Sequence, residues 1–173
     1  MHMADALLAP AVAATMYVAS GAAAGFSVHK LRKDDEDSKK LPVMAVSAAL
    51  VFAGQMINYT IPGTGSSGHM CGGMLLSALL GPQAGFLSMI VILTIQCLFF
   101  GDGGLLALGA NVWNMAFYGC FVGFCLIWKP IMHSNFFGKM GSKAGQRMKI
   151  IVASILGCVI TLQLGAFSVV VET

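Results

Sequence analysis

Residues 84–100 read AGFLSMIVILTIQCLFF, an apolar stretch of seventeen residues without one charged side chain. An α-helix rises by about 1.5 Å per residue, so this stretch would extend for about 26 Å. The hydrocarbon core of a bilayer is about 30 Å thick. The stretch therefore predicts a transmembrane helix, and it indicates that the membrane decides the fold of this chain.

The composition of the whole chain agrees with a membrane fold. Of its 173 residues, 57% are hydrophobic and 10% are charged, whereas a soluble chain carries about 25% charged residues. Long apolar runs occur in six places, and they predict an all-α integral membrane protein, one domain with a bundle of about six transmembrane helices. The predicted spans are 7–28, 41–61, 70–80, 84–100, 105–128 and 149–171.

The run at 70–80 is too short to span a bilayer comfortably alone. Gly-Ser-Ser-Gly (65–68) precedes it and Gly81-Pro82 follows it. Irregular backbone at membrane depth is tolerated only where protein or a water-filled cavity surrounds it. We therefore expect a short or broken helix held within the bundle.

The positive charges predict the direction of the spans. All ten Lys and Arg residues lie in the loops 29–40 and 129–149, and such loops are cytoplasmic by the positive-inside rule. Four predicted segments separate the two loops, an even number, so 70–80 is expected to cross the membrane. No basic stretch is interleaved with aromatic residues, and nucleic acid is therefore not expected as a partner.

With both basic loops inside, the amino terminus and the carboxyl end are expected to face outward. His2, His69 and Asp102 then lie on the outer face, whereas His29 and His133 stay with the cytoplasmic loops. A protein that handles something arriving from outside would use the first group.

Residues 1–28 also have features of a secretory signal peptide, because the Ala-rich stretch 22–24 resembles a cleavage site. A signal peptide begins with a positively charged region. Here Asp5 occupies that place, and the positive charges follow the apolar run. We therefore predict a retained first helix with its amino end outside.

A free amino terminus followed by His2 has a special coordination chemistry. The Met1 amine, the deprotonated amide nitrogen of His2 and its imidazole can close two fused chelate rings on one ion. Three nitrogens then lie in a plane, and a fourth place remains for another donor. Tetragonal nitrogen ligation suits Ni(II) or Cu(II), and imidazole also binds cobalt and zinc. Met1 is expected to be retained, because aminopeptidases remove it only before a small residue.

His69 is the candidate for the fourth donor. It lies on the same predicted outer face as His2, at the start of the short helix and beside a glycine-rich loop that lets backbone approach an ion. We therefore predict a metal site of Met1, His2 and His69. Asp102, within Gly-Asp-Gly-Gly (101–104), either caps a turn or orders the outer loops near the ion.

Two pairs of amide side chains lie inside the predicted spans. Gln55 and Asn58 are three residues apart, as are Asn111 and Asn114, so each pair is expected on one helical face. Two roles remain open, hydrogen bonding across helices or lining a path for a substrate. No predicted span has a charged side chain in its middle, which argues against a proton-coupled pump.

Three stretches resemble one known family. They are MHMADALL (1–8), GHMCGG (68–73) and FFGDGGLLALGANVWNM (99–115). On these residues the chain resembles the CbiM/NikM family, the substrate-binding membrane components of energy-coupling-factor importers for cobalt and nickel. Members usually continue with one or two further hydrophobic segments, so we expect this chain, which ends at Thr173, to lack C-terminal helices of the family.

The resemblance implies both a site and a set of partners. Four nitrogens would hold the ion: the Met1 amine, the amide and imidazole nitrogens of His2, and a ring nitrogen of His69. Ni(II) or Co(II) would be the transported substrate, with no organic cofactor. The protein would be a multi-pass component of a bacterial or archaeal cell membrane and not itself an enzyme. Its expected partners are a transmembrane coupling (T) subunit, a pair of ATPase (A) subunits and, as an open point, a small accessory membrane subunit.

Two other classes of function compete with an importer subunit. A secondary metal permease would work without partners, and vesicles containing this chain alone would then take up the ion. A membrane-embedded metalloenzyme would need a general base beside the ion, for which only Asp5 and Asp102 lie on the predicted outer side. Turnover that is lost in Asp102→Asn while metal still binds would favour the enzyme.

Overall fold

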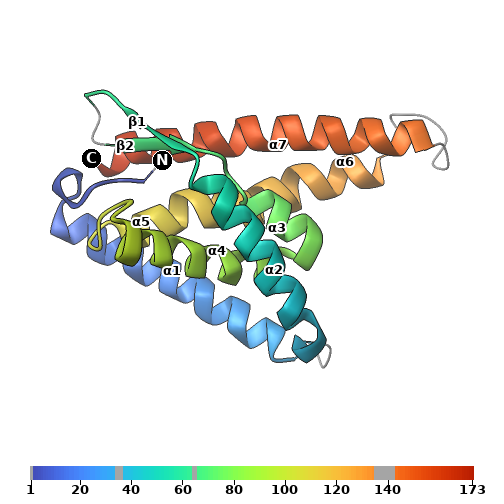
Figure 1. Ribbon diagram of the computed structural model, residues 1–173, viewed down its shortest axis with the longest axis horizontal. Coiled ribbons are helices and arrows are strands. Elements are labelled where there is room, and N and C mark those ends of the chain that lie inside the picture. Colours follow the sequence, from blue (N-terminus) through green and yellow to red (C-terminus); the bar gives the residue numbers. More distant parts are fainter. Residues whose placement is uncertain (1, 34–36, 64–65, 135–142) are drawn as a thin grey trace.

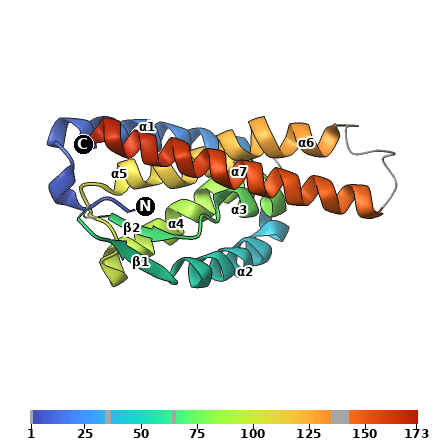
Figure 2. The ribbon, with the colours of Figure 1, turned by 90° about the horizontal axis from the view of Figure 1, so that it is seen from above.

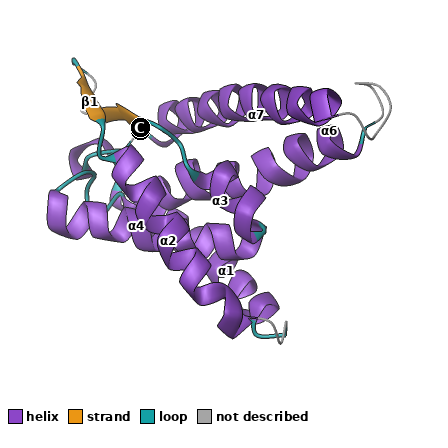
Figure 3. Cartoon of the chain, turned by 45° about the vertical axis from the view of Figure 1, so that its right-hand side comes forward, coloured by secondary structure: helices purple, strands orange, loops and turns teal. Residues whose placement is uncertain are grey.

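The computed structural model describes residues 2–33, 37–63, 66–134 and 143–173. Helices make up most of these residues, and a two-stranded hairpin is added at one end (Figure 3). The elements in chain order are η1 (Asp5–Leu7), α1 (Pro10–Leu31), α2 (Asp37–Gln55), β1 (Asn58–Ile61), β2 (Ser66–His69), α3 (Gly73–Leu80), α4 (Pro82–Phe100), α5 (Leu108–Asn111), η2 (Val112–Trp128), α6 (Lys129–His133) and α7 (Lys143–Glu172). The predicted all-α membrane bundle is confirmed as the fold class.

Four helices of the described ranges are long and apolar enough to cross a membrane, and they match four of the predicted spans. Their bounds are Pro10–Leu31, Pro82–Phe100, Leu108–His133 and Lys143–Glu172. The third joins α5, η2 and α6 without a break, and η2 is wound as a π-helix. The helices at the two remaining predicted spans are shorter than predicted. The apolar part of α2 covers Leu41–Gln55, and α3 has eight residues.

The predicted span 41–61 is wrong at its carboxyl end. The helix stops at Gln55, and residues 58–61 form β1, which pairs antiparallel with β2 and places Asn58 opposite His69. Tyr59 and Ile61 are residue types that favour strands, and an apolar count alone cannot distinguish such a strand from the end of a helix. Gln55 and Asn58 therefore do not share a helical face.

The short helix α3 lies within the bundle, as predicted, against α4 and η2 (Figure 1). At Gly73 the backbones of α3 and η2 come close, because an added Cβ would lie 3.2 Å from the carbonyl oxygen of Met115 and 3.3 Å from Cα of Gly119. Small residues allow such close approach between membrane helices. Buried side chains around this contact include Leu76, Phe86, Met89, Leu93 and Cys120.

Many large apolar side chains point away from the bundle, as expected for helices that face lipid. Val18 of α1 is 73% exposed, Phe99 of α4 is 78% exposed and Val170 of α7 is 72% exposed. In a soluble protein, apolar exposure on this scale would mark an interaction surface. Here it agrees with the four helices that can span a bilayer.

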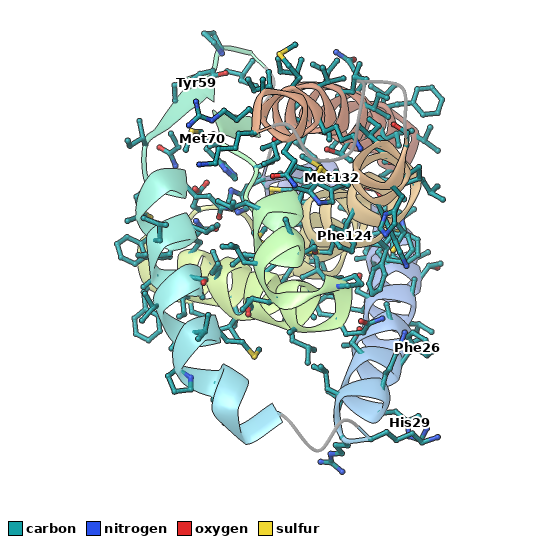
Figure 4. The ribbon with its side chains drawn as sticks, turned by 90° about the vertical axis from the view of Figure 1, so that its right-hand side faces the viewer. Phe26, His29, Tyr59, Met70, Phe124 and Met132 are labelled. Carbon is teal, nitrogen blue, oxygen red and sulfur yellow. The ribbon has the colours of Figure 1, made fainter. Side chains whose placement is uncertain are left out.

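Both chain ends and the hairpin lie together at one end of the molecule (Figures 1 and 2). Figure 4 shows His29 and Phe26 at the foot of α1, far in that view from Tyr59 and Met70 of the hairpin end. The two described histidines that the topology assigns to basic loops, His29 and His133, thus do not join His2 and His69. Which side of the membrane each end faces stays a prediction.

Candidate metal site

The amino-terminal residues form an arm that turns back into the bundle. The backbone N–H of Met3 donates to Oδ1 of Asn111 at 2.8 Å, and its carbonyl oxygen accepts from the N–H of Gly104 at 2.9 Å. Farther along, Oδ1 of Asp5 accepts from the N–H of Ala107 at 3.0 Å. The arm is therefore fixed to α5 and to the loop before it, and His2 is carried into the interior.

The arm brings His2 against His69 of the hairpin. Nδ1 of His2 and Nε2 of His69 are 3.2 Å apart, and the ring centroids are 4.7 Å apart. The two residues are only 3% and 9% exposed. Burial lowers the pKa of His69 to about 4, so its imidazole is neutral at physiological pH and can act as a metal ligand.

The second nitrogen of His69 fixes the tautomer of the ring. Nδ1 lies 2.9 Å from the carbonyl oxygen of Met70, and a carbonyl only accepts, so Nδ1 carries the proton and Nε2 presents a lone pair towards His2. Metal-binding histidines are commonly oriented by such a hydrogen bond. Two neighbouring nitrogen ligands at about 2.1 Å from an ion lie about 3 Å apart. The distance of 3.2 Å between Nδ1 of His2 and Nε2 of His69 fits this spacing.

Side chains alone do not complete a metal site here. Within the described ranges, no group of three or more His, Cys, Asp and Glu residues is arranged to hold an ion. A chelate of Met1 and His2 would supply further donors from the backbone. His2 and His69 are thus brought together, and the third predicted residue, Met1, lies outside the described residues.

Asp102 links the arm to the hairpin. Its Oδ1 lies 3.2 Å from Nδ1 of His2, and its Oδ2 accepts a hydrogen bond of 2.7 Å from Nδ2 of Asn58. Its backbone N–H also donates to the carbonyl oxygen of Gln96 at 3.1 Å, in the turn after α4. Two roles were open for Asp102, capping a turn or ordering the outer loops. Its side-chain contacts with His2 and Asn58 agree with the ordering of loops beside the histidines.

Asn58 is a site residue that the sequence reasoning misplaced, because it was counted within a span. The turn residues Pro62 and Gly63, four and five positions later, are the signal that could have ended the predicted helix earlier. Once the strand is recognised, its register with His69 places Asn58 at the site.

Asn111 and Asn114 do lie on one side of their helix, but their partners differ. Asn111 binds the backbone of Met3, whereas Nδ2 of Asn114 donates to Glu172 of α7 at 2.8 Å and lies 3.9 Å from Sδ of Met3. Both are almost fully buried, with exposures of 1% and 2%. Of the two roles left open, these contacts agree with hydrogen bonding between segments.

Sequence comparison finds relatives that are named as metal transport proteins. Two curated relatives are the fused nickel transport protein NikMN of Rhodobacter capsulatus, 36% identical over 90% of this chain and 42% of its own length, and the cobalt transport protein CbiM of Sorangium cellulosum, 34% identical over 72% and 56%. The chain spans about half the length of the curated relatives it matches.

A similar structure has also been solved. The crystal structure of a transition metal transporter superposes with a TM-score of 0.82 at 34% identity, over 99% of this chain and 69% of that one. The family model described as the cobalt uptake substrate-specific transmembrane region matches residues 2–173. This chain therefore belongs to the CbiM family of cobalt uptake transmembrane proteins.

Proposed function

We propose that this chain is the ion-binding membrane subunit of an ATP-driven importer for Ni(II) and Co(II). The observation that carries the proposal is the buried pair of ring nitrogens, Nδ1 of His2 and Nε2 of His69, 3.2 Å apart. The Met1 amine and the His2 amide nitrogen would add two donors, and four nitrogens would then surround the ion. Relatives named for nickel and for cobalt support these two ions.

We infer that ion binding and ATP hydrolysis are carried out by different subunits. The chain binds and carries the ion, and ATP would be hydrolysed by two ATPase subunits that act through a transmembrane coupling subunit, with a small accessory membrane subunit as a further partner. The positive-inside rule supports an outward-facing site, because Lys30 and Lys129 adjoin the basic loops at the ends of α1 and η2. Family membership supports a substrate-binding role.

Metal titration of the purified chain tests the proposed chelate. Native protein should bind Ni(II) and Co(II) in competition at one site, whereas His2→Ala and a variant with one extra residue before Met1 should bind both ions at least about a hundredfold more weakly. Mass spectrometry of the native sample checks that the Met1 amine is free. Unchanged affinity in both variants would rule out the amino-terminal chelate.

A vesicle experiment tests the need for partners. Vesicles that contain this chain alone should bind the ion without accumulating it, and uptake should require the coupling and ATPase subunits together with ATP. Accumulation by the chain alone would instead identify a secondary permease.

A further inference from the structure

The side-chain amide of Asn111 contacts both backbone groups of Met3 in the arm, as the backbone of a neighbouring β-strand would. Its Oδ1 accepts from the N–H of Met3 at 2.8 Å, and its Nδ2 faces the carbonyl oxygen of the same residue at 3.4 Å. Both contacts are buried and join residues 108 positions apart. Because both hydrogen bonds go to the backbone of Met3, they hold the arm at one register whatever the side chain at position 3.

The loop before α5 is shaped around this contact. Gly103 has a φ of 90°, a conformation that glycine adopts without strain. A Cβ at this position would lie 2.8 Å from Nδ2 of Asn111 and 3.1 Å from Cβ of His2. The absence of a side chain at Gly103 thus lets His2 and Asn111 lie side by side.

We propose that Asn111 is a positioning residue that docks the arm before an ion arrives. By fixing the backbone of Met3, it delivers His2 to His69 in the metal-free protein. This consequence for metal binding rests on the proposed function, whereas the docking itself does not. Asn111 touches no ion and acts only through the arm that it holds.

An arm that docks before the ion binds should affect the affinity for Ni(II) and Co(II) in a measurable way. An arm that is already ordered does not lose its conformational freedom when the ion binds. Loss of the dock should therefore weaken Ni(II) and Co(II) by the same factor, because the ligands of the bound ion stay the same. The visible spectrum of the metal-saturated protein should also stay the same, which a change of ligand would not allow.

Hydrogen exchange of the metal-free full chain tests the docking directly. In the native protein the amide of Met3 should be protected, and in Asn111→Ala it should exchange at least about tenfold faster. Asn111→Asp keeps an oxygen that can accept from Met3 and should restore most of the protection. Asn114→Ala is the matched control, because Asn114 is equally buried but donates to Glu172 and lies 3.9 Å from Sδ of Met3, without a hydrogen bond to the Met3 backbone. It should leave the Met3 amide protected, because Asn111 still accepts from that amide.

Three outcomes would overturn the proposal: rapid exchange of the Met3 amide in the native chain, unchanged protection in Asn111→Ala, or an equal increase in Asn111→Ala and Asn114→Ala. The first outcome is measured on the native chain, so it can overturn the proposal even where Asn111→Ala does not fold.

Metal titration of the same variants completes the test. Asn111→Ala should bind Ni(II) and Co(II) about tenfold more weakly with an unchanged spectrum at saturation, and Asn114→Ala should stay within about threefold of native. A loss confined to one ion, or an altered spectrum, would overturn the positioning role. If native protein binds neither ion while the Met3 amide still depends on Asn111, the proposed function fails and the docking stands.

Discussion

Two regions of this protein are held together by different forces. The site end, formed by the arm 2–8, the strands 58–61 and 66–69, the loop 101–107 and α5, is joined by polar contacts between distant segments, such as Met3 with Asn111 and Asn58 with Asp102. The α3 core, formed by α3 and the facing parts of α4 and η2, is joined by apolar contacts and by the close approach of Gly73 to Gly119.

The difference has a physical cause and a consequence. Lipid tails are as apolar as the helix surfaces, so helices in a bilayer associate through close packing and hydrogen bonds rather than through the hydrophobic effect. The α3 core should therefore set the stability of the bundle. The polar contacts of the site end position the proposed ligands, and they should set metal affinity. Substitutions in the two regions should separate these two properties.

The largest effect is expected for His69→Ala. It removes Nε2, which lies 3.2 Å from His2, and a ligand lost from a site should weaken binding by about a hundredfold or more, beyond the ten- to hundredfold typical of outer partners. Calorimetric titration with Ni(II) and Co(II) measures this loss. The denaturation midpoint without metal should change little, and a large drop in that midpoint would break the separation between the two regions.

The next effect is expected in the α3 core, for Gly73→Ala. The new methyl group would meet backbone of η2 at 3.2–3.3 Å, and such overpacking costs about 1–3 kcal/mol of unfolding free energy. Gly21→Ala is the matched control, because an added Cβ there meets nothing within 4 Å. Denaturant unfolding in detergent measures both variants. Equal stability of the two would show that the close approach does not hold the core.

The parts of this fold that sequence predicts well are those set by local composition. Four apolar runs identified the four long helices, because a helix must satisfy its own backbone groups in lipid. Charge in the loops grouped His2 with His69 and excluded His29, and the structure places the first two in contact. This grouping follows from the number of predicted spans between each histidine and the basic loops, and it requires no three-dimensional structure.

The parts that sequence missed depend on pairing between distant residues. Tyr59 and Ile61 of β1 extend the apolar run of α2, and the pairing of β1 with 66–69 identifies it as a strand. Asn111 and Asn114 are the same residue type on the same helix, yet Asn111 binds the backbone of Met3, whereas Asn114 binds Glu172 and lies 3.9 Å from Sδ of Met3. Nothing within the helix itself distinguishes the two, because their partners come from distant parts of the chain.

A smaller effect is expected for Asn58→Ala at the site end. Its Nδ2 donates to Asp102, which in turn approaches His2, and removal of such an outer partner should weaken metal binding by about tenfold. Thr60→Ala, on the same strand and exposed, serves as the control and should bind as native protein does. Comparable losses in both variants would mean that the whole hairpin matters and the single hydrogen bond does not.

The smallest effect is expected where a polar contact lies inside the bundle. Nε2 of Gln96 donates to Oε1 of Gln55 at 3.0 Å between α4 and α2, while Oε1 of Gln96 is buried and has no hydrogen-bond partner among the described residues. Replacing both residues by Met removes the bond and the unsatisfied oxygen together, so the unfolding free energy should stay within about 1 kcal/mol.

Gln96→Met alone leaves the buried oxygen of Gln55 without its donor and should cost more than the double replacement, by about 1–3 kcal/mol. Denaturant unfolding of the two single variants and the double variant measures this difference, and metal affinity should be unchanged in all three. A double variant less stable than both singles would mean that this polar pair stabilises the bundle, as the close packing at Gly73 does. Polar contacts would then contribute to stability inside the bundle as well as at the site end. The two regions would in that case differ in their place in the molecule and not in the kind of contact that holds them.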